Sequence, residues 1–98
     1  MDKLKSALEK AWEDGFFYNL RYGFINRYEF EELKSYFDNV SEEEIDFRDK
    51  RLLSLLWFIP LFISWQEERL RNNKTSEEAI KEVSNYFYNQ CERILGLP

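Results

Sequence analysis

Hydrophobic positions recur along the first part of this chain at the spacing of one helix face. The stripe consists of Leu4, Leu8, Ala11, Gly15, Tyr18 and Tyr22. At 3.6 residues per turn it predicts a single helix that ends at Gly23, because glycine readily takes the left-handed conformation that closes a helix. Phe16, Phe17 and Leu20 fall on the other sides of this helix, so we expect its second half to be more completely buried.

A second helix is predicted to begin at Asn26, which precedes Glu29 by the spacing of a capping box. The apolar face of this helix is Phe30, Leu33 and Phe37, and the opposite face carries Tyr28, Glu31, Glu32, Ser35 and Asp38. Ser41 and Glu44 repeat the capping spacing ahead of a short acidic turn, in which Ile45 is expected to point inward.

Residues 52–65 read LLSLLWFIPLFISW, where two serines and one proline interrupt large apolar side chains. No face of this segment is polar, so we expect the rest of the chain to surround it. As a helix it covers about 21 Å at 1.5 Å per residue, which favours a buried core helix over a membrane span of about 20 apolar residues. Pro60 lacks an amide donor and predicts a kink or break between Leu56 and Pro60, with the Leu56 carbonyl in need of another donor.

Asp46 or Asp49 is expected to begin this apolar helix, and residues 72–74 to form the loop that follows it. Thr75 and Glu78 have the spacing of a third capping box. The last helix then carries its apolar residues three or four apart, namely Ala79, Ile80, Val83, Phe87, Cys91 and Ile94. Gly96 followed by Leu97 predicts a Schellman ending, with Leu97 folded back on the last turn.

These elements predict an all-α fold, since no stretch alternates as a strand would. We expect a single helical domain over residues 1–98, because 98 residues with 44% hydrophobic content suffice for one core. The expected architecture is a compact antiparallel bundle of four to five helices around a central apolar helix that is kinked or broken near Pro60.

Charge is distributed unevenly along the chain. The formal net charge is −5, and residues 29–49 contain nine acidic and two basic residues, so that the remaining residues sum to +2. This balance disfavours nucleic acid and anionic membranes as partners and favours a basic protein. The acidic segment is either a solvated face or a docking surface with Tyr28 as an aromatic anchor. The candidate partner-binding residues are Tyr28, Glu31, Glu32, Ser35, Asp38, Glu42, Glu43 and Asp46.

The chemistry of enzymes is poorly represented in this sequence. It contains no histidine and no glycine-rich phosphate loop, and the acidic turn lacks the alternating ligands of a calcium loop. Cys91 lies on an apolar stripe, where a buried structural role is expected. We therefore expect no catalytic residues, no metal and no cofactor. One cysteine and the absence of a signal-peptide pattern favour a cytoplasmic location.

Three stretches carry a family resemblance: residues 14–23 (DGFFYNLRYG), 55–69 (LLWFIPLFISWQEER) and 92–98 (ERILGLP). They resemble small helical immunity proteins of bacterial polymorphic toxin systems, those of contact-dependent growth inhibition in particular. The resemblance spans most of the chain and consists of core and capping residues. It implies a protein that binds a cognate toxin, often a basic nuclease, and blocks its active site or its substrate surface.

The leading hypothesis is therefore an immunity protein that neutralises a basic nuclease toxin through its acidic surface, and we expect a monomer. The alternative is a non-catalytic helical interaction or regulatory module that forms a homodimer, which apolar surface left exposed after folding would favour. An acidic mimic of DNA would need carboxylates spread over a longer surface than residues 29–49 offer, and an enzyme would need a general base.

Overall fold

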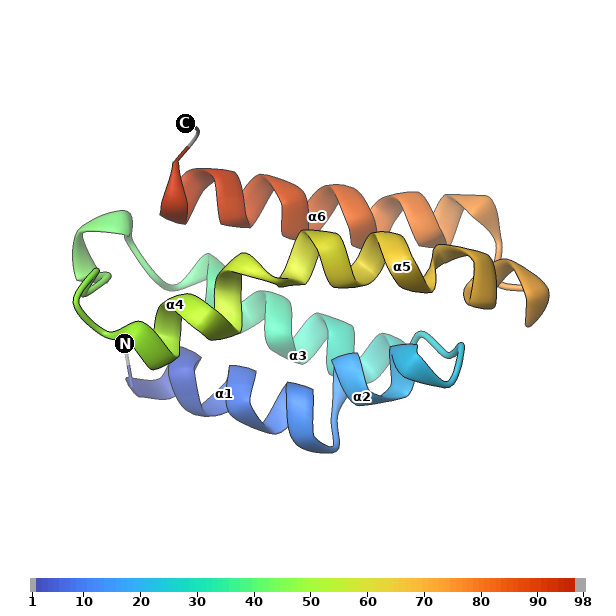
Figure 1. Cartoon of the computed structure of the whole chain (residues 1–98), viewed down its shortest axis with the longest axis horizontal. Helices are drawn as coiled ribbons and strands as arrows, with labels where there is room; N and C mark the ends of the chain where they lie inside the picture. The colour runs from blue at the N-terminus through green and yellow to red at the C-terminus, as the bar shows by residue number, and fades with distance from the viewer. Residues whose placement is uncertain (1, 97–98) are drawn as a thin grey trace.

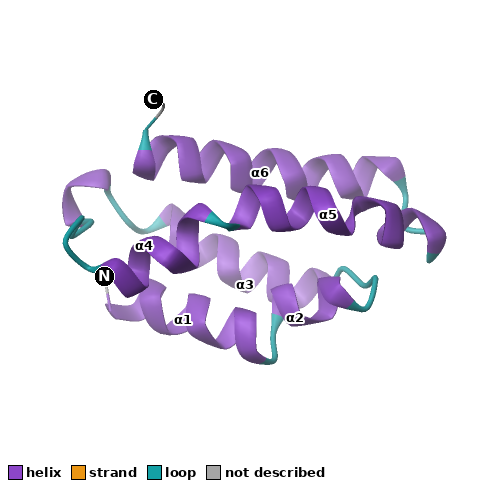
Figure 2. Cartoon of the chain, viewed as in Figure 1, coloured by secondary structure: helices purple, strands orange, loops and turns teal. Residues whose placement is uncertain are grey.

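The computed structural model describes residues 2–96, with the backbone alone for Asp2. Over this range the chain forms helices and turns and no strand (Figure 2), which confirms the all-α prediction. The helices are α1 (Asp2–Glu13), α2 (Phe16–Arg21), α3 (Arg27–Asp38), the 3₁₀ helix η1 (Glu42–Glu44), α4 (Lys50–Trp57), α5 (Ile59–Asn72) and α6 (Glu77–Leu95).

Figure 1 shows how the helices are arranged in a body of 39 × 28 × 20 Å. Helices α1, α2, α4 and α5 run in one direction, whereas α3 and α6 run in the other. Helix α1 packs on α3 and on α4, and α5 packs on α6. The pairs α1–α3 and α5–α6 are thus antiparallel, whereas α1 and α4 are parallel neighbours. Helices α4 and α5 lie nearest the viewer, with α3 behind them (Figures 1 and 2).

The core is centred on Phe87 of α6. Its ring centroid lies 5.7 Å from that of Phe16, 5.4 Å from Phe17, 5.8 Å from Phe30 and 5.7 Å from Phe37. All five rings are fully buried. Aromatic pairs at these separations add to the stability that burial alone provides, so α6 joins α2 and α3 into one core.

The prediction of one helix from the N-terminus to Gly23 is wrong, because the chain breaks at Gly15 into α1 and α2. The break changes the phase of the apolar stripe. Tyr18 and Tyr22 were placed on the buried face, yet they are 39% and 57% exposed. Phe16, Phe17 and Leu20 are buried instead. Two phenylalanines and a leucine gain more from burial than two tyrosines, whose hydroxyls need a polar partner.

Most predicted helix starts are confirmed. The start at Asn26 has an incomplete capping box, and the start of the last helix is displaced by one residue. The Asn26 side chain accepts a hydrogen bond from the Glu29 amide at 3.1 Å. The Glu29 carboxylate does not complete a capping box, because it accepts a hydrogen bond from the Asn19 side chain at 2.7 Å instead. Ser41 and Glu44 form the full reciprocal box. Of the two residues proposed to start the apolar helix, Asp49 caps α4.

The last helix begins one residue later than predicted. Ser76, not Thr75, accepts from the Ala79 amide at 3.1 Å. Ser76 has an extended backbone and is followed by two acidic residues in the first turn of α6, where the helix dipole favours them. At the other end, Gly96 has φ 80° and its amide donates to the Glu92 carbonyl at 2.8 Å. The predicted fold-back of Leu97 lies outside the described residues.

The break near Pro60 is present. Helix α4 ends at Trp57 and α5 begins at Ile59, so Pro60 lies in the first turn of α5, where a missing amide is tolerated. The freed Leu56 carbonyl accepts from the Phe58 amide and from the Cys91 thiol, whose sulfur is 3.4 Å away.

Residues 52–65 are not surrounded on all sides, and this expectation is wrong. Leu52, Leu55, Leu56, Ile59, Phe62 and Ile63 face the core. On the outer side, Trp57 is 58%, Leu61 42% and Trp65 61% exposed. The reason is geometric, because the helices that contact α4 and α5, namely α1, α2 and α6, leave Trp57, Leu61 and Trp65 exposed. Among the described helices, none is both long and apolar enough to cross a membrane.

Candidate protein-binding surface

The outer side of α3 is determined by what its inner side buries. Phe30, Leu33 and Phe37 point into the core, so the residues between them face outward. All eight candidate partner-binding residues are exposed. They form two groups, one on α3 (Tyr28, Glu31, Glu32, Ser35 and Asp38) and one in and after η1 (Glu42, Glu43 and Asp46). We refer to these eight residues as the acidic surface.

Arg93 of α6 holds the η1 group against the end of α3. Its guanidinium donates to the carbonyls of Phe37 and Val40, both at 3.0 Å. It also lies 3.6 Å from a carboxylate oxygen of Glu42. The guanidinium therefore links the last turn of α3, at Phe37, to the segment that precedes η1, at Val40. Sequence reasoning did not find Arg93, because it lies more than 50 residues from Phe37, Val40 and Glu42.

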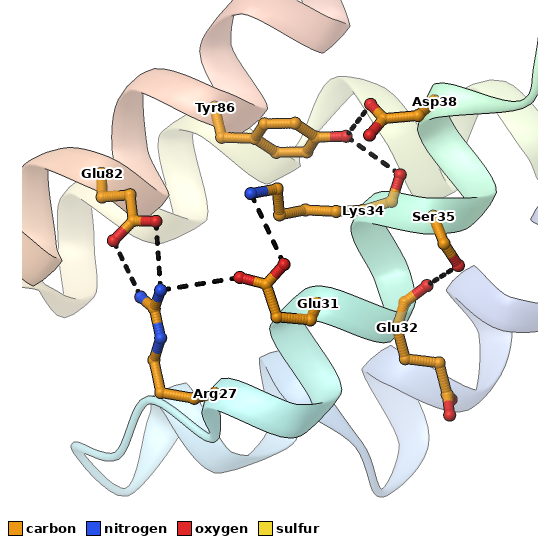
Figure 3. A network of polar contacts seen from close by, with 8 residues as sticks. All are labelled: Arg27, Glu31, Glu32, Lys34, Ser35, Asp38, Glu82 and Tyr86. Atoms are coloured by element: carbon orange, nitrogen blue, oxygen red, sulfur yellow. Dashed lines mark hydrogen bonds and ion pairs between the residues drawn. The ribbon is translucent and has the colours of Figure 1, made fainter.

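Within the α3 group, Glu31 and Asp38 face α6 across a network of polar contacts (Figure 3). Glu31 lies 3.6 Å from both Arg27 and Lys34, and Arg27 also forms two hydrogen bonds with Glu82, at 2.8 and 3.1 Å. The spacing of Arg27 and Glu31 by four residues was visible in the sequence. The pairing of Arg27 with Glu82 of α6 was not, because it depends on the tertiary fold.

Asp38 at the far end of this network accepts a hydrogen bond from Tyr86. The Tyr86 hydroxyl lies 2.9 Å from the Asp38 carboxylate and 3.2 Å from the Lys34 carbonyl. Burial and this hydrogen bond to a carboxylate raise the pKa of Tyr86 above its ordinary value. The phenol therefore stays protonated and acts as a donor, and Asp38 is already engaged within the chain.

Glu32 points the other way, toward α1 (Figure 3). It lines a groove of about 390 Å³ between α1 and α3. The small residues Ala7, Ala11 and Gly15 leave this space open, and Lys10 lies on the opposite wall from Glu32. The Ser35 hydroxyl does not contribute a free donor, because it donates to the Glu32 carbonyl at 2.6 Å.

The η1 group contains one carboxylate held by its own chain segment. Asp46 accepts from the Arg48 amide at 2.9 Å and from the Arg48 guanidinium at 3.2 Å. The Arg48 amide and then its side chain lower the pKa of Asp46. Glu43, by contrast, forms no side-chain hydrogen bond or ion pair with any residue that the structure describes, and the same is true of Glu32 and of the Tyr28 hydroxyl.

The structure thus reduces the charge that residues 29–49 present. Lys34 and Arg48 within the segment, and Lys5, Arg27 and Arg93 from outside it, pair with its carboxylates. Exposed ion pairs of this kind add little stability and are screened by salt. Because the side chains of Glu31, Glu42 and Asp46 remain 57%, 55% and 53% exposed, an incoming cation can still reach them.

Other reactive groups are few. Cys91 is buried, and burial raises the pKa of its thiol to about 12, so it remains an uncharged thiol at neutral pH. Within residues 3–96, no three His, Cys, Asp or Glu side chains are grouped closely enough to hold a metal ion. The chain matches no known family model, and no curated protein or solved structure matches it significantly.

Proposed function

We propose that this chain is a non-catalytic, cytoplasmic binding protein that neutralises a basic toxin, of the nuclease kind, by covering its cationic surface. The observation that carries the proposal is the set of unengaged exposed groups within the acidic surface. Tyr28 is 77% exposed, and Glu32 and Glu43 face solvent without an ion pair among the described residues. They lie among carboxylates whose own ion pairs are exposed and weak.

The physical basis of neutralisation is charge replacement. A nuclease binds the phosphates of its substrate with lysine and arginine side chains. Carboxylates on a rigid helix and its following turn can occupy the same positions and exclude the substrate. Clustered charge of one sign also speeds association with a basic partner. An exposed tyrosine beside these acids provides the kind of aromatic anchor that dominates binding energy in interfaces.

The groove between α1 and α3 gives this surface a concave region. Its floor is apolar, its α3 wall carries Glu32, and its α1 wall carries Lys3 and Lys10. A lysine or arginine side chain has an aliphatic stem and a charged end, so its stem fits the apolar floor with its charge beside Glu32 and away from the α1 wall. We therefore propose that one basic side chain of the toxin enters this groove beside Glu32, one helical turn after Tyr28.

The test is the affinity of this chain for a purified basic toxin domain that is encoded by the gene next to its own. The affinity is measured by calorimetry at 0.15 M salt. We expect the Glu32→Lys/Glu43→Lys double variant to bind at least 100-fold more weakly, with a weaker salt dependence. The matched control is Glu13→Lys/Glu92→Lys, which changes the net charge equally at two exposed helix ends outside the acidic surface. This control should bind like the natural chain.

A second variant tests the groove without changing charge. Ala7→Leu fills space between α1 and α3, and we expect about tenfold weaker binding with an unchanged circular dichroism spectrum. If the double charge variant binds as tightly as its control, the acidic surface is not where the toxin binds. If the chain also fails to protect cells that express the toxin, the neutralising function itself is wrong.

A second candidate function is a helical interaction module that forms a homodimer. The exposed side chains of Trp57, Leu61 and Trp65 favour it, because large apolar side chains gathered on one face of a protein are typical of interaction sites.

A further inference from the structure

The outer side of α4 and α5 carries a continuous apolar surface. Trp57, Leu61 and Trp65 follow one another at intervals of four residues, which places them on one side of a helix. The break between the helices is a single residue, Phe58, whose backbone is helical, so the spacing carries across it. Both indoles are supported from below, since the Phe58 ring lies 5.5 Å from Trp57 and 5.4 Å from Trp65.

This surface is connected to the core through Phe58 and Trp12. The Phe58 ring lies 6.0 Å from Trp12, whose indole nitrogen donates to the Leu55 carbonyl at 3.0 Å. The serines along the same side offer no free donor. Ser54 donates to the Arg51 carbonyl at 2.8 Å and Ser64 to the Leu61 carbonyl at 2.7 Å. A partner would thus meet ordered apolar groups without unsatisfied hydroxyls.

The two ends of this surface carry opposite charges. Lys50 is the first residue of α4 and Glu68 lies toward the end of α5, and both are exposed. Neither takes part in an ion pair with another described residue, whereas Arg71 nearby pairs with Glu77. We define the α4–α5 stripe as Lys50, Ser54, Trp57, Leu61, Trp65 and Glu68.

We propose that the α4–α5 stripe binds the same stripe of a second copy of this chain, antiparallel and related by a two-fold axis near Ile59. Lys50 precedes Ile59 by nine residues and Glu68 follows it by nine, about 13 Å on each side at 1.5 Å per residue. The two-fold axis therefore places Lys50 of each copy opposite Glu68 of the other, and Trp57 opposite Leu61. A surface that is complementary to itself in this way is what a closed dimer requires.

The size of the stripe suits the centre of a dimer interface. A tryptophan contributes roughly 150–250 Å² when it is buried, so two indoles that are 58% and 61% exposed offer roughly 200–300 Å² per copy. A stable interface buries about 800 Å² per partner, with aromatic side chains at its centre and charged residues at its rim. The stripe is arranged in the same way, with its aromatic side chains near the centre and its charged residues at the two ends.

The stripe and the α3 group of the acidic surface lie on different sides of the molecule. Helices α4 and α5 are on the near side of Figure 1 and α3 is on the far side. A dimer through the stripe therefore leaves the α3 group of both copies free, and it neither requires nor excludes the neutralising function proposed above. The sequence analysis favours a monomer and names apolar surface left exposed after folding as the feature that would favour a homodimer.

Sedimentation velocity of the natural chain between 1 and 200 µM tests the proposal. We expect the mass to rise with concentration from 12.1 kDa toward twice that value, together with a blue shift of tryptophan emission. Leu61→Glu should weaken the dimer at least 100-fold. Phe24→Glu is the matched control, since Phe24 is 61% exposed and lies outside the stripe, and it should leave the dimer intact. Circular dichroism verifies that both variants fold.

Charge exchange tests the antiparallel arrangement. Lys50→Glu and Glu68→Lys should each weaken the dimer about tenfold, because each puts like charges opposite each other at both ends. An equimolar mixture of the two single variants should recover the affinity, since each then meets an opposite charge. A chain that remains monomeric at 200 µM, a dimer that survives Leu61→Glu, or a mixture that fails to recover affinity would each overturn the proposal.

Discussion

The sulfur of Cys91 lies 3.4 Å from the carbonyl oxygen of Leu56. In an unbroken helix this carbonyl would accept a hydrogen bond from the amide of residue 60, but Pro60 has no amide hydrogen to donate. The α4–α5 break is therefore stabilised by a side chain from α6. Trp12 from α1 does the same for the preceding carbonyl, that of Leu55. A local defect in one helix is thus bridged by donors from two others, which fixes where the two halves of this apolar segment lie.

Cys91→Ala is expected to lower the free energy of unfolding by about 1–2 kcal/mol, because it removes the thiol donor and leaves a small void in the core. Urea denaturation followed by circular dichroism measures this loss. Cys91→Ser is the comparison variant, since it keeps a donor at the same position. We expect it to lose less than Cys91→Ala. An equal or larger loss would mean that packing, not the hydrogen bond, is the role of the thiol.

The same thiol makes stability depend on alkaline pH. Burial raises its pKa to about 12 in the folded chain, whereas an exposed cysteine ionises near pH 8.5. Above this pH the unfolded chain binds fewer protons than the folded one, so stability falls as pH rises toward about 12. The difference in urea midpoint between the natural chain and Cys91→Ala should therefore shrink from pH 8 to pH 10. A constant difference would contradict the raised pKa.

Gly23→Ala is expected to destabilise the chain by about 2–3 kcal/mol. Gly23 has φ 85°, which costs any other residue about 1–2 kcal/mol. An added methyl group would also collide with the Asn73 side chain, whose amide donates to the Tyr22 and Gly23 carbonyls at 3.1 and 3.3 Å. Thermal unfolding measures the effect.

Gly96→Ala is the matched control for this change. Gly96 has φ 80°, and among the described residues no atom lies within 4 Å of an added methyl group. Gly96→Ala should therefore show only the loss of stability that the backbone conformation causes. Gly23→Ala should lose more stability than Gly96→Ala. The Gly23→Ala/Asn73→Ala double variant should recover part of this additional loss, because the added methyl group no longer collides with the Asn73 side chain. Losses of equal size at both glycines would show that the contact with Asn73 is unimportant.

Arg93→Lys is expected to lower stability by about 1–2 kcal/mol, because a lysine is shorter and lacks the planar fork whose two nitrogens donate to the Phe37 and Val40 carbonyls. It should also loosen η1, so hydrogen exchange of the amides in residues 40–45 should become faster. Arg48→Lys is the control, since the Arg48 side chain is 93% exposed, and should change neither quantity. Unchanged exchange in Arg93→Lys would show that η1 is held by its own capping box.

Local signals in the sequence predicted local structure well. In α3 and α6, the apolar residues three or four positions apart are the ones that the fold buries. They are Phe30, Leu33 and Phe37 in α3, and Ile80, Val83, Phe87, Cys91 and Ile94 in α6. Asn26, Ser41 and Gly23 act at helix ends as predicted, because capping depends on residues close in sequence. The exposure of the acidic surface follows from the same periodicity, since it lies opposite a buried face.

Two features depended on the tertiary fold and were missed. Whether Gly15 continues or ends a helix depends on whether Phe16 and Phe17 or Tyr18 and Tyr22 reach the core, which is decided by the neighbouring helices. The cations that pair with the acidic segment, such as Lys5 and Arg93, are remote in sequence. A count of charge along the chain therefore overstated the negative charge that this surface presents.

Phe87 makes the order of synthesis matter for this protein. The rings that it contacts come from α2 and α3, which leave the ribosome well before α6. Until Phe87 arrives, these rings lack the partner that shields them from water, and the earlier helices have no closed interior. The nascent chain therefore exposes aromatic side chains to chaperones and proteases until α6 docks, and a copy shortened before α6 should be degraded rather than accumulate as a partial fold.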